Sequence, residues 1–168
     1  MVFQQIHLVR RRSALDNVAC GALGRMGFWR SLSPRFFPAD VRAAALAALE
    51  RVGLADHAEK RADTLSGGQA QRVAVARALC QQASVIMADE PVASLDPRAA
   101  EDVMRLLGEI AHRDGLAVAC VLHQPDLARR HADRLVGMLR GTVAFDRLPS
   151  AVTDDEVALL YRDEDDDD

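Results

Sequence analysis

The sequence has few aromatic residues. Phe, Trp and Tyr make up 4% of the 168 residues, so the apolar fraction of 49% rests mainly on Ala, Val and Leu. The length is sufficient for one domain with such a core.

Cysteines and long apolar runs are also scarce. Cys20, Cys80 and Cys120 are odd in number, and no C-x-x-C pair occurs, so neither a disulfide framework nor a zinc site is indicated. A reducing cytosol fits this pattern. No apolar run is longer than Leu116 to Leu122, which is far shorter than the ~20 residues that span a bilayer, and no secretory signal opens the chain. We therefore expect any membrane association to go through a partner.

Negative charge is concentrated at the end of the chain. The formal charge is −4, but residues 153–168 hold nine acids and one Arg, so they carry −8 and the rest carries +4. The run from Asp163 to Asp168 repels itself, and we expect a disordered, solvated tail.

Periodicity, caps and turn residues predict helices first and then alternating strands and helices. Residues 10–35 are expected to form loops with a short helix or two. Caps are predicted at Asp40, at Ser66, at Asp96 before Pro97, and in a Thr153–Glu156 capping box. The helices are predicted over 41–52, 67–81, 97–115, 125–132 and after residue 153. The strands are predicted over 84–89 and 116–122, both apolar and expected to be buried and parallel, and over 135–139 and 142–145, expected to form a hairpin.

Two short segments of the sequence suggest a site for binding or hydrolysing a phosphate group. Asp89 and Glu90 follow an apolar strand, where a carboxylate can hold Mg²⁺ and a neighbour can polarise water. Gly67 and Gly68 after Ser66 let backbone N–H groups approach an anion at a helix N-terminus. Taken alone, the first pair is more often a cap or a solvated turn, and the second an ordinary glycine loop.

Together these segments resemble the ATP-binding cassette (ABC) family in order and spacing. The resemblance runs from Gln4 to about Asp146. It implies an α/β fold, a partial P-loop NTPase (ABC ATPase) fold with a helical subdomain (about 8–82) and the C-terminal part of a mainly parallel sheet flanked by helices (about 83–152). Residues 153–168 would add a C-terminal helix and the acidic tail. The segments that carry the resemblance are Leu65–Gln69, Gln71–Leu79, Asp89-Glu90-Pro91, Ser94-Leu95-Asp96 and Leu122-His123.

The resemblance implies ATP and Mg²⁺ as ligands and assigns a role to each matching residue. Glu90 would be the general base, and His123 would contact the γ-phosphate. Asp89 and Gln4 would act on Mg²⁺, and Gln4 would also sense the membrane partner. The residues expected to bind ATP, including the clamp on a γ-phosphate held by the opposite subunit and the dimer-interface loop, are Gln4, Ser66, Gly67, Gly68, Gln69 and Asp96. The histidines that match nothing are expected to be surface residues: His7, His57, His112 and His131.

Other segments resemble the phosphonate-import branch of the family. They include 21–25, 28–32 and 47–54, and the Phe28-Trp29 pair would either receive a permease helix or pack in the core. The resemblance implies an ATPase at the cytoplasmic face of the bacterial inner membrane. Its partners would be a second ABC ATPase subunit, integral membrane permease subunits and, indirectly, a periplasmic substrate-binding protein, with no nucleic acid.

One motif of the family is not found in these 168 residues. A P-loop needs G-x-x-x-x-G-K-[ST], and the single lysine, Lys60, has no glycines in the required places before it. We therefore expect an N-terminally truncated cassette with negligible ATPase activity alone, whose signature segment Leu65–Gln69 could still complete the site of an intact subunit. The alternatives are a non-enzymatic remnant or interaction partner, and a cassette ATPase of DNA repair, for which the charge is too small and the usual insertions are absent.

Overall fold

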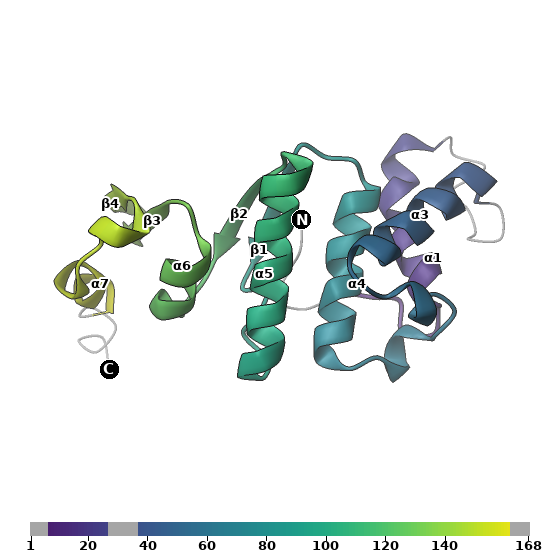
Figure 1. Ribbon diagram of the computed structural model, residues 1–168, viewed down its shortest axis with the longest axis horizontal. Coiled ribbons are helices and arrows are strands. Elements are labelled where there is room, and N and C mark those ends of the chain that lie inside the picture. Colours follow the sequence, from purple (N-terminus) through teal and green to yellow (C-terminus); the bar gives the residue numbers. More distant parts are fainter. Residues whose placement is uncertain (1–6, 27–36, 162–168) are drawn as a thin grey trace. The chain divides into compact units, whose positions relative to one another are not determined.

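Helices dominate the first half of the chain, as the sequence predicts, and strands appear after residue 84 (Figure 1). The computed structural model describes residues 7–26 and 37–161. By its internal contacts the chain divides into two units, Met1–Val121 and Leu122–Asp168. The boundary predicted between residues 82 and 83 stays a prediction. The elements of the first unit, with η for 3-10 turns, are α1 (Ala14–Ala19), η1 (Cys20–Arg25), α3 (Ala39–Arg51), η3 (Ala55–His57), η4 (Ala62–Thr64), α4 (Gly67–Cys80), β1 (Val85–Asp89), α5 (Pro97–Asp114) and β2 (Ala117–Val121).

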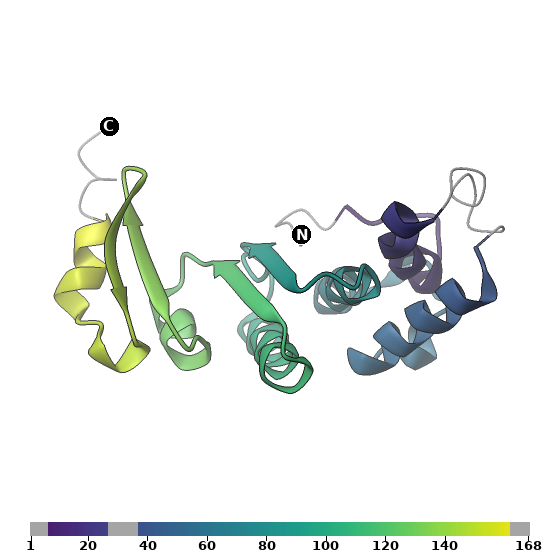
Figure 2. The ribbon, with the colours of Figure 1, turned by 90° about the horizontal axis from the view of Figure 1, so that it is seen from above.

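The helices α1, α3 and α4 pack against one another and form an alanine-rich core (Figures 1 and 2). Close backbone approach replaces bulky side chains here. A Cβ atom added to Gly21 would lie 2.2 Å from the carbonyl oxygen of Arg77, so only glycine fits where η1 crosses α4. The fully buried apolar residues of this block include Ala14, Val18, Ala45, Leu49, Val73, Val75 and Ala76.

The strands β1 and β2 pair in parallel, in register from Val85 opposite Ala117 to Asp89 opposite Val121. Helix α5 runs along one face of the β1–β2 pair (Figures 1 and 2). Ile86 on β1 is buried. The prediction of buried strands was wrong for both: Val85 and Met87 on β1 are 50% and 54% exposed, and no residue of β2 is buried. In the described part of the chain, a helix layer covers only one face of this pair.

Of the three caps predicted for helices of the first unit, two are confirmed. Ser66 caps α4 and Asp96 caps α5, with Pro97 at the first helical position. Asp40 does not cap α3, which begins at Ala39 after Pro38, two residues earlier than predicted. Pro38 has the extended backbone of an N-cap but no side-chain acceptor, so Asp40 falls in the first turn, where a carboxylate is favoured by the helix dipole.

The second unit contains a hairpin and short helices. Strands β3 (Leu135–Leu139) and β4 (Thr142–Arg147) are antiparallel, as predicted, with a register shift between Gly137 and Met138. The capping box of Thr153 and Glu156 is confirmed at the start of α7 (Asp154–Tyr161). None of the helices in the described residues is both long and apolar enough to cross a bilayer. The other elements of this unit are α6 (Pro125–His131) and η5 (Pro149–Ala151).

Candidate functional site

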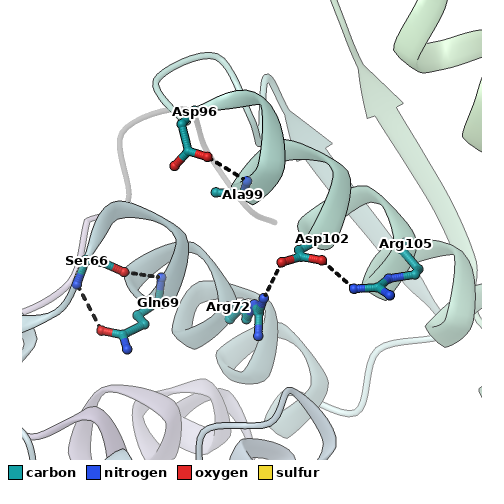
Figure 3. A network of polar contacts seen from close by, with 7 residues as sticks. All are labelled: Ser66, Gln69, Arg72, Asp96, Ala99, Asp102 and Arg105. Atoms are coloured by element: carbon teal, nitrogen blue, oxygen red, sulfur yellow. Dashed lines mark hydrogen bonds and ion pairs between the residues drawn. The ribbon is translucent and has the colours of Figure 1, made fainter.

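Helix α4 begins with a complete capping box. The side-chain Oγ of Ser66 accepts a hydrogen bond from the backbone N–H of Gln69 at 3.3 Å. The Gln69 side-chain Oε1 accepts in return from the backbone N–H of Ser66 at 3.0 Å (Figure 3). This reciprocal pair fixes the turn that carries both glycines, and it leaves the N–H groups of the first helical residues available to an acceptor.

The start of α5 lies against this turn. Asp96 caps α5 by accepting from the N–H of Ala99 at 3.0 Å. A Cβ atom on Gly67 would lie 3.2 Å from the Leu95 side chain, and one on Gly68 would lie 3.2 Å from the Cβ of Ala99. The two glycines therefore allow the two helix N-termini to approach each other more closely than other residues would allow.

A cavity of about 460 Å³ opens between these two helix starts. It is lined by most of the residues expected to bind ATP and by both charged and neutral groups. Free N–H donors and the positive ends of two helices favour an anion such as a phosphate group at this place. The lining residues are Gly53, Leu54, His57, Ser66, Gly67, Gly68, Gln69, Arg72, Ser94, Leu95, Asp96, Arg98, Ala99 and Asp102.

An ion-pair network ties α4 to α5 beside the cavity. Asp102 on α5 accepts from Arg72 on α4 at 3.3 Å, and its other oxygen pairs with Arg105 one turn further along α5 (Figure 3). The side chains of Arg72 and Asp102 are each 31% exposed. Such a partly exposed pair stabilises by roughly 1 kcal/mol or less. Its main effect is therefore to set the spacing of the two helices.

One residue of this site was not found by sequence reasoning. His57 was expected on the surface, but it is half-buried in the cavity wall. Its Nε2 lies 3.2 Å from the side-chain nitrogen of Gln69, and its Nδ1 is buried without a hydrogen-bond partner among the described residues. No motif includes His57, because it reaches the signature segment through tertiary packing from η3.

The strand-end carboxylates lie where the sequence places them. Asp89 is the exposed last residue of β1. Glu90 follows with a left-handed backbone, φ 44°, and its N–H donates to the carbonyl of Val121 at 3.1 Å. Residues other than glycine and asparagine rarely adopt this left-handed conformation. Where one does, the surrounding structure holds its backbone in place. The turn thus fixes where the Glu90 side chain begins.

Asp89 is the described residue that could bind Mg²⁺. Among the described residues, no three His, Cys, Asp or Glu side chains converge as a metal cluster. Mg²⁺ does not require one, because it commonly binds through one or two carboxylates together with substrate phosphates and water. An exposed carboxylate at a strand end suits that mode, so Asp89 fits the ion.

The remaining predicted site residues lie outside this arrangement. His123 is exposed in the second unit, and its carbonyl accepts a hydrogen bond from the hydroxyl of Tyr161 at 3.2 Å. Gln4, Phe28 and Trp29 fall outside the described residues. The structure therefore brings together Ser66, the two glycines, Gln69 and Asp96, and the roles given to all site residues stay predictions.

Comparison with curated proteins gives close relatives that are longer than this chain. The family profile described as "ABC transporter" matches residues 1–93. The phosphonates import ATP-binding protein PhnC of Bradyrhizobium diazoefficiens is 52% identical over 161 residues, which are 96% of this chain and 60% of the relative. The PhnC of Frankia casuarinae is 53% identical over 162 residues, 96% of this chain and 64% of that protein. The chain thus spans about 60% of the length of such relatives.

Solved structures give the same fold. A dimeric ATP-binding cassette in a post-hydrolysis state, bound to ADP and Pi, is 33% identical with a TM-score of 0.69, covering 88% of this chain and 61% of that one. The fold is that of the ABC ATPase cassettes, a P-loop NTPase fold, present here in part. With more than half of its length matched by the family profile and with half of its aligned residues identical to curated members, the chain belongs to the ABC transporter family.

Proposed function

We propose that this chain is part of an ATP-hydrolysing subunit that energises an ABC importer for phosphonates. One observation carries the proposal: the capped N-termini of α4 and α5 line a single cavity that presents Ser66, Gly67, Gly68 and Gln69 to an anion. The relatives named as phosphonate import ATP-binding proteins support the cargo class.

In this proposal the cavity clamps the γ-phosphate of an ATP molecule bound by a second ABC ATPase subunit. The backbone N–H groups at the start of α4 and the hydroxyl of Ser66 would donate to its oxygens, and they stabilise most where negative charge develops. Asp96 would lie at the interface between subunits. The positive ends of both helices would favour the anion without a buried counter-charge.

The strand-end residues would serve hydrolysis when a P-loop holds phosphates beside them. Glu90 would accept a proton from the water that attacks the γ-phosphorus, while ADP leaves with the bridging oxygen. Asp89, with Gln4, would hold Mg²⁺, which neutralises phosphate charge when bound. His123 would donate to the γ-phosphate. Because no P-loop motif occurs in the 168 residues, we propose that the chain alone hydrolyses ATP negligibly and acts with an intact subunit.

The site of action would be the cytoplasmic face of the bacterial inner membrane. Integral membrane permease subunits would dock on the ATPase dimer, and a periplasmic binding protein would deliver the phosphonate to them. No nucleic acid takes part. A second candidate, a non-enzymatic partner of an intact subunit, is favoured by the same missing motif and would bind that subunit without changing its turnover.

The test uses a mixed dimer of this chain with an intact phosphonate-importer ATPase whose own signature serine is replaced. That partner can bind ATP but lacks a clamp, so ATPase activity should depend on Ser66 of this chain. Ser66→Arg should lower the activity at least about a hundredfold, and Ser84→Arg, outside the cavity, should not. Equal activity with and without this chain would contradict the proposal, and binding without any gain in activity would favour the non-enzymatic partner.

A further inference from the structure

The imidazole of His57 contacts the side chain of Gln69, in the turn Ser66–Gln69 at the start of α4. We propose that His57 is a positioning residue for the segment Ser66–Gln69 and acts through the side-chain amide of Gln69. Its neutral form, with the proton on Nδ1, is the form that holds the amide in place. The use of this contact in clamping a phosphate rests on the proposed function, but the contact itself does not.

The donors and acceptors fix the orientation of the amide. The backbone N–H of Ser66 is a donor, so the atom of Gln69 that faces it at 3.0 Å must be Oε1. The Gln69 amide nitrogen then faces Nε2 of His57 at 3.2 Å. An amide nitrogen can only donate, so Nε2 of His57 must accept, and the ring proton must lie on Nδ1.

A positive charge on His57 is incompatible with this chain of hydrogen bonds. Both ring nitrogens of a protonated imidazole are donors. With the amide as it stands, two donors would face each other across 3.2 Å. If the amide turned over, its nitrogen would face the Ser66 N–H instead, and the capping box would lose its second bond. Either orientation leaves one pair of donors opposed, so protonation releases Gln69 from Ser66.

The position of the ring supports a role beyond packing. His57 ends the turn η3, while Gln69 and Ser66 are at the start of α4, so the contact joins two elements that line the same cavity. Charged groups on that cavity are Arg72 from α4 and Asp96, Arg98 and Asp102 from the α5 side. On its own element the neighbour is Asp56, and α3, which also contacts η3, ends in Glu50 and Arg51.

The ion pairs around the cavity engage other charged groups, while the ring of His57 contacts Gln69 through Nε2. Asp102 is shared by Arg72 and Arg105, and Arg51 pairs with Asp114. Asp96 caps α5 through Ala99. Within the described part of the chain, Nδ1 of His57 has no hydrogen-bond partner, so Nε2 is the atom through which the ring acts.

The test is amide hydrogen exchange at Ser66 in the full chain, because this N–H is held by the Gln69 side chain. His57→Lys presents a permanent donor, and we expect Ser66 to exchange roughly fivefold faster, after correction for intrinsic rates. His57→Gln keeps an acceptor oxygen and should retain the protection.

His112→Gln is the matched control, because His112 lies in the last turn of α5 and does not line the cavity. Protection at Ser66 that is unchanged in His57→Lys would overturn the proposal. So would a loss spread over the whole of α4 and equal in His57→Gln and His57→Lys, since that result assigns His57 a packing role only. No nucleotide enters the measurement, so a positive result stands even if the mixed-dimer experiment fails.

Discussion

The helical block of the first unit and the hairpin of the second are stabilised by different means. In the helical block, small apolar side chains are fully buried and backbones nearly touch, as at Gly21. Among the described residues of the second unit, the buried apolar side chains are Leu127, Phe145 and Val152. There, elements are joined by surface ion pairs, which are Arg129–Asp154, Arg134–Asp146 and Arg147–Glu156. The first unit therefore depends on exact fit, whereas the second has fewer buried apolar side chains on which its stability can rest.

The largest effect is expected from Gly21→Ala in the first unit. The new Cβ would lie 2.2 Å from the backbone oxygen of Arg77, so η1 or α4 must shift. We expect a loss of about 3 kcal/mol in the free energy of unfolding, measured by denaturant titration. Gly24→Ala is the control, because nothing lies within 4 Å of its added Cβ. Equal losses in both variants would show that close packing does not explain the effect.

A smaller effect is expected from Gly137→Ala in the hairpin. Its Cβ would meet the Phe145 ring at 2.3 Å. A ring can turn aside where a backbone cannot, so we expect a loss of about 1 kcal/mol, measured in the same titration. A loss as large as that of Gly21→Ala would erase the distinction between the two regions.

The smallest effect concerns charge in the hairpin. The hydrogen bond from Arg134 holds the pKa of Asp146 below its ordinary value. The stability that this pair contributes is present above the ordinary carboxylate range, and it is lost as the pH falls through the depressed pKa. Arg134→Gln should raise the pKa of Asp146 towards its ordinary value, as followed by NMR titration. Because both groups are exposed, added salt should shrink the difference, and a pKa unchanged by the substitution would contradict this account.

The caps and strand order could be predicted because they depend on residues close in sequence. Ser66 with Gln69, and Asp96 with Pro97, each place an acceptor where a helix leaves N–H groups unpaired. Asp40 shows the limit of this reasoning, since α3 begins two residues earlier than predicted, after Pro38. The exposure of Val85 and Met87 could not be predicted either, because an apolar strand does not record how many of its faces are covered.

The candidate site divides in the same way. Its glycines and carboxylates were found from motifs, while His57 was missed, because a histidine in a short turn has no local pattern that points to Gln69.

The sequence by itself determined the local conformations and the order of the family segments, since capping and turn chemistry act over three or four residues. Only the tertiary structure decided that the starts of α4 and α5 share a cavity and that an imidazole closes one side of it. The shared cavity depends on glycines that let the two helix ends approach within van der Waals contact. Contacts of this kind join residues distant in sequence, so no periodic pattern in the chain reveals them.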